Sequence, residues 1–243
     1  MIPNDYDLTY FENELAKMNL VLSEDQKYRF IKYYELLTEW NQKINLTAIT
    51  AFDEVIRKHF LDSLYFFKLP DISSGGTMID VGTGAGFPGI PVAIVCPEIK
   101  VTLLDSLKKR VDFLTLCGTE LALNNIEPVH ARAEDAARDP SFREQYDWAV
   151  SRAVASLPVL CEYCLPFVKK GGAFVSYKSL KAEQEVKEAE KAVQLLGGSV
   201  ERITHMKLAD TNEERNLVLI RKTGRTPEKY PRKSGVPSKK PIS

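Results

Sequence analysis

The sequence predicts an α/β protein whose core is a doubly wound, mostly parallel sheet, preceded by a helical extension. Three observations lead to this prediction. From residue 77 onward, short apolar runs alternate with amphipathic helical stretches, as in sheets whose parallel strands are connected by helices. The first apolar run leads into a glycine-rich turn at residues 82–89, which is typical of ligand-binding α/β sheets. Residues 1–70 instead carry apolar side chains at helical spacing.

The first 70 residues are expected to form two main helices. Ser23 and Gln26 have the spacing of a capping box, followed by apolar residues at helical spacing up to Trp40. A second helix is expected over residues 53–67, where His59 and Asp62 lie three apart and can share a face. We interpret His59 as structural, with a catalytic role as the alternative.

A polar, turn-rich stretch at residues 70–76 marks the expected boundary between the helical extension and the sheet. The predicted division is a helical extension (1–70), a sheet domain (71–222) and a basic, proline-rich tail (223–243).

The glycine-rich turn permits two ligand classes. The acid-x-Gly-x-Gly-x-Gly pattern of S-adenosylmethionine (SAM) enzymes is present as Asp80, Gly82, Gly84 and Gly86. The dinucleotide pattern is also present, as Gly84, Gly86 and Gly89, with Asp105 about 20 residues after the turn. Asp80 separates the two, because a carboxylate repels a pyrophosphate but suits the ammonium group of SAM. We therefore expect SAM as the cofactor, with a dinucleotide or a ligand-free turn as alternatives.

The order of elements predicts the class I SAM-methyltransferase version of the doubly wound sheet, with seven strands. Strands are expected near residues 78–81, 101–105, 129–131, 147–151, 173–177, 200–208 and 216–221. Helices are expected after residue 88 and over residues 107–123, 157–168 and 182–196. Five strand–helix units followed by two late strands are typical of that fold.

Candidate binding residues follow from the rule that such sheets bind ligands outside the carboxyl ends of their strands. The rule selects Asp80, Gly82, Gly84, Phe87, Asp105, Ser106, Arg132, Ala133, Glu134 and Arg152. Asp105 can accept hydrogen bonds from both ribose hydroxyls of the cofactor. Ala133 and Glu134 lie where an adenine edge would reach. For Asp105 and Glu134 the alternative is a solvated acid.

Arg132 and Arg152 are expected to converge on the mouth of the pocket, where cations bind the phosphates of a nucleic acid and a guanidinium can stack on a base. The alternative for them is a salt bridge with Glu134 or Asp135.

The end of the fourth expected strand limits the chemistry. Ser151-Arg152-Ala153-Val154 lacks the Asn/Asp-Pro-Pro-aromatic motif that methylates exocyclic amines, and no cysteine nucleophile lies there. Guanine N7 fits as the methyl acceptor, because its lone pair carries no proton and needs only in-line alignment, without a general base or a covalent intermediate. An oxygen acceptor is not excluded.

Charge is distributed unevenly along a chain of zero formal net charge. Residues 221–243 carry eight Lys and Arg and one acid, a formal charge of +7, which leaves −7 on the other 220 residues. The tail also contains four prolines, so we expect it to be extended or disordered when free, without a packed core. Contact with RNA phosphates is its predicted role, and a solubilising tail is the alternative.

The sequence does not predict a secreted, membrane-spanning or metal-binding protein. The first residues include acids and no apolar h-region, and no apolar run approaches the roughly 20 residues of a membrane span. Cys161 and Cys164 lie within an apolar helical pattern with no second pair of ligands, so we interpret them as core thiols and expect no metal. The predicted protein is cytoplasmic and monomeric, with no membrane partner.

Several motifs together resemble one family. They are Asn41-x-x-x-Asn45-Leu46-Thr47, Lys58-His59-Phe60-Leu61-Asp62-Ser63, Asp80 to Pro91, Leu104-Asp105-Ser106-Leu107, Arg132-Ala133-Glu134 and Ser151-Arg152-Ala153. The family is the bacterial small-subunit ribosomal RNA guanine-N7 methyltransferase, formerly called glucose-inhibited division protein B. The resemblance covers nearly the whole chain, including Lys229-Tyr230-Pro231-Arg232-Lys233 in the tail.

The resemblance implies methylation of guanine N7 in the 530 loop of 16S rRNA, on the small ribosomal subunit or an assembly intermediate. It implies contacts to SAM from Gly82, Phe87, Ala133, Glu134 and Arg152, and active-site roles for Arg132 and Arg152. From the residues alone, two alternatives stay open: a SAM-binding regulator without catalysis and an NAD-linked reductase.

Overall fold

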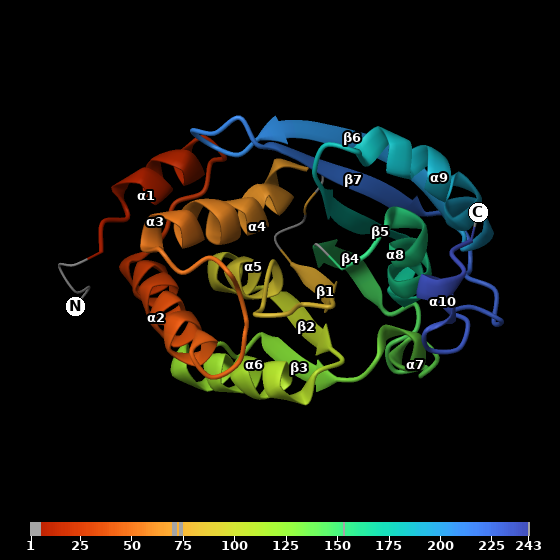
Figure 1. Cartoon of the computed structure of the whole chain (residues 1–243), viewed down its shortest axis with the longest axis horizontal. Helices are drawn as coiled ribbons and strands as arrows, with labels where there is room; N and C mark the ends of the chain where they lie inside the picture. Colours follow the sequence, from red (N-terminus) through yellow and green to blue (C-terminus); the bar gives the residue numbers. More distant parts are fainter. Residues whose placement is uncertain (1–5, 70–71, 73–74, 153, 243) are drawn as a thin grey trace.

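The computed structural model describes residues 6–69, 72, 75–152 and 154–242. At its centre lies one seven-stranded sheet with the strand order β3-β2-β1-β4-β5-β7-β6 (Figure 1). Strands β1 to β5 run parallel, and β7 runs antiparallel to both of its neighbours, β5 and β6. The predicted fold class, a doubly wound sheet of the SAM-methyltransferase kind, is confirmed.

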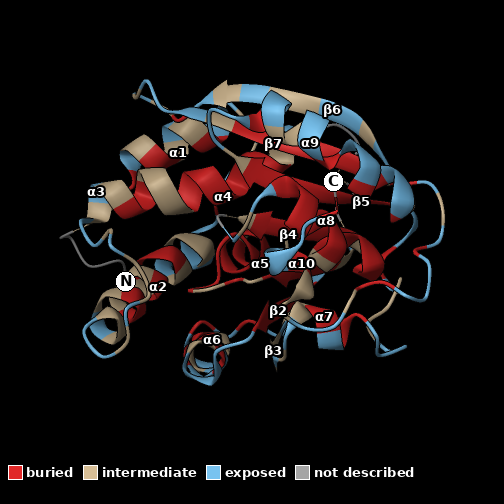
Figure 2. Cartoon of the chain, turned by 45° about the vertical axis from the view of Figure 1, so that its right-hand side comes forward, coloured by how far each residue is buried: buried red, intermediate tan, exposed pale blue. Residues whose placement is uncertain are grey.

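The strands agree with the predicted ones to within a few residues. They are β1 (Gly76–Val81), β2 (Ile99–Asp105), β3 (Ile126–His130), β4 (Tyr146–Arg152), β5 (Val168–Lys178), β6 (Gly198–Lys207) and β7 (Glu214–Lys222). The central strands are buried along most of their length (Figure 2), which is why they read as continuous apolar runs.

The helices between strands also follow the prediction, apart from the short α7, which was not expected. They are α5 (Gly89–Val95), α6 (Lys108–Glu120), α7 (Ala133–Ala136), α8 (Leu157–Cys164) and α9 (Ala182–Leu195). Cys161 and Cys164 are fully buried in α8, and burial raises the pKa of both thiols above the ordinary value. Their interpretation as core thiols is confirmed.

The N-terminal region is helical, as predicted. It contains α1 (Thr9–Ala16), α2 (Glu24–Asn41) and a broken helix made of α3 (Phe52–Val55), η1 (Ile56–Leu61), α4 (Asp62–Leu64) and η2 (Tyr65–Lys68). The capping box of Ser23 and Gln26 is present at the start of α2. The η1 segment is a π-helix, a local widening that is frequent at functional sites, and it carries Lys58 and His59.

The helices form a layer on each face of the sheet. Helices α1, α2, α4, α5 and α6 pack with one face in a shared apolar core. Helices α7, α8 and α9 pack on the other face. The N-terminal helices therefore belong to the core of the sheet domain and bring their polar residues to its carboxyl edge.

The expectation of a tail without a packed core is wrong. Residues 223–242 lie against the α8 side of the sheet (Figure 1), and Tyr230 and Ile242 belong to the apolar core on that face. The segment ends in a short helix, α10 (Val236–Lys239). Arg232 pairs with Glu162 of α8, which is 0 % exposed. Isolated apolar residues and one buried acid thus fix a segment whose composition alone suggested disorder.

Part of the expected boundary at residues 70–76, and the acidic start of the chain up to Asp5, lie outside the described residues. Within the described part of the chain, no helix has both the length and the apolar character needed to span a bilayer.

Candidate active site

The glycine-rich turn connects β1 to α5 and is held by Asp80. One oxygen of this carboxylate, Oδ2, accepts hydrogen bonds from Thr83 Oγ1 at 2.7 Å and from the backbone N–H of Gly89 at 2.8 Å. The other oxygen, Oδ1, is buried without a hydrogen-bond partner. Burial raises the pKa of Asp80 to about 6, against the effect of the two hydrogen bonds. Asp80 therefore organises the turn and keeps one acceptor atom unused.

Two glycines of the turn show why side chains are absent there. A Cβ atom on Gly82 would lie 2.7 Å from Val154 Cγ2, whereas a Cβ on Gly84 would meet no atom within 4 Å. Both residues have positive φ angles, +72° and +64°, which glycine adopts without strain. The open space over Gly84 is where a ligand can approach the backbone.

Asp105 lies at the end of β2, beside the turn, and is 3 % exposed. Its Oδ1 accepts from the N–H of Leu107, and its Oδ2 accepts from the N–H of Gly84 at 3.0 Å and from Arg110 Nη1 at 3.4 Å. A carboxylate offers about four acceptor positions, so Oδ1 retains one. The Arg110 contact is long enough to be exchanged for a ligand hydroxyl.

A hollow of about 390 Å³ lies over the turn. Its lining comes from the turn, from the strand ends and from the N-terminal region: Leu46, Thr47, His59, Gly82, Thr83, Gly84, Ala85, Phe87, Asp105, Ser106, Arg110, Arg152 and Val154. Tyr33 of α2 donates a hydrogen bond from its hydroxyl to the carbonyl of Ala85 at 2.5 Å, which fixes the helical extension to the turn.

Arg152, the last residue of β4, is held on several sides. Its Nη1 donates to Asp62 Oδ2 at 2.8 Å and to the carbonyl of Lys58 at 3.2 Å. Its guanidinium carbon lies 5.0 Å from the centre of the Phe87 ring, within the range of cation–π attraction. The alternative salt bridge of Arg152 with Glu134 or Asp135 is wrong, because its partner is Asp62.

Burial keeps His59 neutral, and the position of Arg152 determines which ring nitrogen carries the proton. Arg152 Nη2 lies 3.2 Å from His59 Nδ1, and because a guanidinium only donates, Nδ1 must be the acceptor. Burial and the nearby arginine lower the pKa of His59 to about 3, so the ring is neutral and carries its proton on Nε2. That N–H points to Thr47 Oγ1, 2.8 Å away.

Thr47 receives a second hydrogen bond at the same oxygen, from the N–H of Ile49 at 3.0 Å. Two donors occupy both acceptor positions of a hydroxyl, so its own hydrogen remains available to donate. Because Thr47 lines the hollow over the turn, the chain from Arg152 through His59 leaves a hydroxyl donor at the edge of that hollow.

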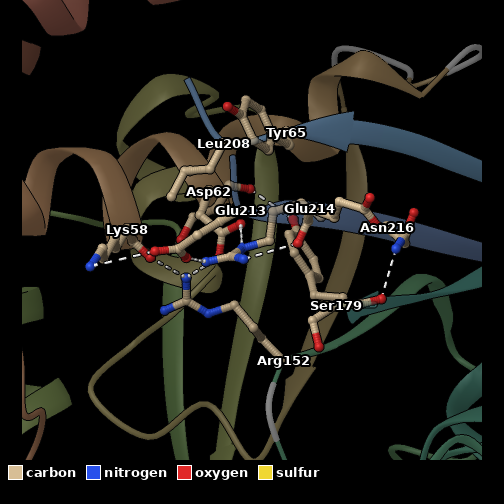
Figure 3. Close-up of polar contacts among 12 residues, drawn as sticks. Lys58, Asp62, Tyr65, Arg152, Ser179, Leu208, Glu213, Glu214 and Asn216 are labelled. Carbon is tan, nitrogen blue, oxygen red and sulfur yellow. Dashed lines mark hydrogen bonds and ion pairs between the residues drawn. The ribbon is translucent and has the colours of Figure 1, made fainter. Parts of the chain in front are cut away.

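A second hollow of about 450 Å³ lies on the other side of Arg152 and His59. Its lining is strongly polar: Lys58, His59, Asp62, Arg152, Tyr177, Lys178, Ser179, Glu185 and Arg215. Asp62 accepts from Arg152 through Oδ2 (Figure 3). Its other oxygen, Oδ1, accepts from Arg215 Nε at 3.1 Å. Both guanidinium groups keep further N–H groups.

Arg132, Ala133 and Glu134 lie at a third hollow of about 170 Å³, which adjoins the first through Gly82, Asp105, Ser106 and Val154. The Arg132 side chain is exposed, whereas Glu134 is 5 % exposed. Ala133 and Glu134 begin α7, so their N–H groups precede its first intrahelical bond. Arg132 and Arg152 therefore line different hollows instead of converging at one point.

A larger hollow, about 940 Å³, lies elsewhere, at the amino ends of β2 and β3. Its lining combines scattered polar residues, such as Gln26, Glu98 and Asn125, with apolar ones. Parallel sheets bind their ligands at the opposite edge, so the three smaller hollows form the candidate site.

Sequence reasoning selected the strand-end residues but missed the contribution of the helical extension. Thr47, His59 and Asp62 reach the site from segments far from the glycine turn. The one available signal was the pair of motifs around Asn41–Thr47 and Lys58–Ser63, which have more polar residues than a packing helix needs.

Comparison with known proteins identifies the family. A family model described as rRNA small subunit methyltransferase G matches residues 26–218, more than half of the chain. The chain belongs to this family. Full-length relatives agree: a protein named ribosomal RNA small subunit methyltransferase G from Desulforamulus reducens is 51 % identical over 238 residues, covering 98 % of this chain and 99 % of the relative.

A second relative of that name, from Clostridium botulinum (strain Eklund 17B), is 51 % identical over 225 residues and covers 93 % of this chain and 94 % of the relative. The family resemblance expected from the sequence is therefore confirmed. Residues 219–243, which include the whole C-terminal segment, lie outside the residues matched by the family model.

Solved structures share the fold at low identity. TYW2 of M. jannaschii, in complex with AdoMet, superposes with a TM-score of 0.53 at 14 % identity, over 71 % of this chain and 77 % of that one. The [4+2]-cyclase SpnF has a TM-score of 0.58 at 15 % identity, over 78 % and 93 %. At such low identity the shared fold does not assign an activity, so function has to be argued from the site.

Proposed function

We propose that this member of the rRNA small subunit methyltransferase G family uses SAM to methylate N7 of a guanine in the 530 loop of 16S rRNA. One observation carries the proposal beyond the family name. Arg152 and His59 line both the hollow over the glycine turn and the second, polar hollow, so a methyl donor in one can face a base in the other.

The residues present fit SAM in the first and third hollows. Open space over Gly84 admits the ligand against the backbone. The unpartnered Oδ1 of Asp80 is buried beneath the turn and would accept from the cofactor ammonium through water. Asp105 would hold the ribose hydroxyls beside Ser106. The 170 Å³ hollow lined by Ala133 and Glu134 would take the adenine.

When bound, the cofactor supplies an electrophilic methyl group on a sulfonium. The chain then has to align guanine N7 with it, and no proton has to be removed, because N7 carries none. Positioning alone can contribute about 7–11 kcal/mol to such a step. A general base is therefore not required among the residues of the second hollow.

In this proposal the second hollow receives the base. Guanine presents two acceptors, N7 and O6, on one edge. A donor to N7 would block the reaction, so the useful donors are those that reach O6 or the neighbouring phosphates. Arg152, Lys58 and Arg215 supply them. Asp62 and the Phe87 ring fix the guanidinium of Arg152, which lowers the cost of ordering it.

The test is methylation in vitro with methyl-labelled SAM and small subunits that lack their native modification. Borohydride and aniline cleave RNA at N7-methylguanine, so cleavage at one guanine of the 530 loop is the expected result. Label at another position would refute the target. An absence of label on subunits and on naked rRNA would refute the enzymatic activity.

A further inference from the structure

The C-terminal segment, residues 223–242, lies beside the hollow proposed to take adenine. Gly235 and Ser238 line that hollow together with Ala133 and Glu134, and α10 lies close to α7 and α8 (Figure 1). The segment is therefore part of the wall of the candidate cofactor site, although it follows the last strand of the sheet.

One hydrogen bond connects the segment to the hollow. The backbone N–H of Gly235 donates to Glu134 Oε1 at 2.8 Å. Glu134 is almost fully buried at the start of α7, and a carboxylate held at one oxygen presents the other in a fixed direction. Because Glu134 lines the hollow, that second oxygen is available to a ligand there.

The segment is anchored without help from a ligand. Arg232 forms a two-pronged ion pair with buried Glu162, through Nε at 2.9 Å and Nη2 at 2.6 Å. Arg143 donates to the carbonyls of Thr226 and Tyr230. Lys222, buried just before the segment begins, donates to the carbonyl of Leu165. The Gly235 N–H is thus held in place before any ligand binds.

We propose that this segment determines the base specificity of the cofactor site, with Gly235 as a positioning residue that orients Glu134. The second carboxylate oxygen then accepts a hydrogen bond from the 6-amino group of adenine and repels the 6-oxo group of hypoxanthine. This inference rests on the proposed function, in which that hollow takes the adenine of SAM.

Gly235 offers a matched pair of full-length variants. Its φ angle is +79°, and a Cβ there would meet no atom within 4 Å. Gly235→Asn retains the conformation, because asparagine tolerates positive φ, whereas the β-branched side chain of Gly235→Val does not. Only the valine variant should displace the N–H from Glu134.

The experiment measures the dissociation constants of S-adenosylhomocysteine and S-inosylhomocysteine by calorimetry. The wild-type chain should prefer the adenosyl compound by about ten-fold or more, the value of one hydrogen bond to a charged group. Gly235→Val should lose most of that preference, and Gly235→Asn should keep it. In Glu134→Ala, which removes the carboxylate, the further change Gly235→Val should have no effect on selectivity.

Equal selectivity in wild type and Gly235→Val would overturn the inference, as would additive effects of Gly235→Val and Glu134→Ala. A wild-type chain that binds neither compound would instead overturn the proposed function. If Gly235→Val fails to fold, Glu134→Ala alone tests the inference. Unchanged selectivity in that variant would show that the Glu134 carboxylate does not distinguish the two bases.

Discussion

At the scale of single residues, the site contains polar groups whose hydrogen-bonding capacity is only partly used. Asp80 holds the turn with one oxygen and leaves the other without a partner. Thr47 accepts two hydrogen bonds and keeps its own hydrogen. A buried polar atom without a partner costs free energy, so Asp80 gains more from a ligand than a saturated group would.

The pH dependence of SAM binding follows from Asp80. Burial raises its pKa to about 6, so the folded chain holds this proton more tightly than the unfolded chain. Without ligand, the contribution of Asp80 to stability is therefore lost as the pH rises from about 4 to 6. An ammonium ligand prefers the carboxylate, so affinity for SAM should be constant above pH 7 and fall below about pH 6.

Calorimetry between pH 5 and 8 measures this dependence. Asp80→Asn should bind SAM more weakly at pH 8 and show a flatter profile, because the titrating group is gone. An identical profile in the two proteins would remove Asp80 from cofactor binding.

Thr47 should donate to an acceptor oxygen of the bound ligands, either the cofactor carboxylate or guanine O6. Thr47→Val keeps the shape of the side chain and should lower either SAM affinity or turnover by roughly two- to ten-fold, the value of one neutral hydrogen bond. Thr47→Ser should recover most of this loss. A larger dissociation constant for SAM would identify the cofactor carboxylate as the acceptor. A slower turnover at unchanged SAM affinity would identify guanine O6. No change in either quantity would contradict the hydrogen-bond count.

At the scale of elements, the fold depends on how α8 holds the C-terminal segment. Glu162 of α8 is fully buried, and its charge is balanced by Arg232 from 70 residues further along the chain. A buried ion pair adds little net stability, but removing one partner leaves an uncompensated buried charge. The pair therefore fixes where the segment lies more than it strengthens the fold.

Arg232→Met should lower the free energy of unfolding by about 3–5 kcal/mol. The neighbouring exposed residue provides the control, since Lys233→Met should change it by less than about 0.5 kcal/mol. Urea denaturation measures both values. Equal stability of the two variants would mean that Glu162 finds another partner.

The elements that sequence patterns predicted are those with a repeated local signal. Strands β1 and β2 are mostly buried and largely apolar, and α9 carries its apolar residues at helical spacing, so neighbouring residues indicate the same structure. The C-terminal segment lacks such a signal. Tyr230, Arg232 and Ile242 each make a separate long-range contact, and composition cannot report a contact with a residue 70 positions away.

At the scale of the whole molecule, the candidate site is assembled from three parts of the chain. The sheet gives the turn and Arg152, the helical extension gives Thr47 and His59, and the C-terminal segment gives Gly235. Only the first part follows from strand order, which is why Asp80, Asp105 and Arg152 could be selected from the sequence. Which side chain of another segment meets them depends on packing.

The exposed basic residues of the C-terminal segment are candidates for contact with RNA. The segment buries its apolar residues and exposes Arg225, Lys229, Lys233, Lys239 and Lys240, so order and RNA contact are compatible. Replacing the last four of these with alanine should weaken binding to rRNA and flatten its salt dependence. The log–log slope should fall by roughly 0.7–0.9 for each lysine that neutralises a phosphate in the wild-type complex.

Filter binding at several salt concentrations measures that slope. Lys100→Ala, an exposed lysine at the amino edge of the sheet, serves as the control and should leave it unchanged. An unchanged slope in the quadruple variant would assign the segment to cofactor binding alone.

The contact between Gly235 and Glu134 can form only late in synthesis of the chain. A ribosome synthesises the glycine turn about 150 residues before Gly235, so a nascent chain can form most of its sheet while one wall of the adenine hollow is still missing. Cofactor selection would then begin only when the segment emerges and docks on α8. Unfinished chains would keep the architecture of the enzyme without its full discrimination between nucleosides.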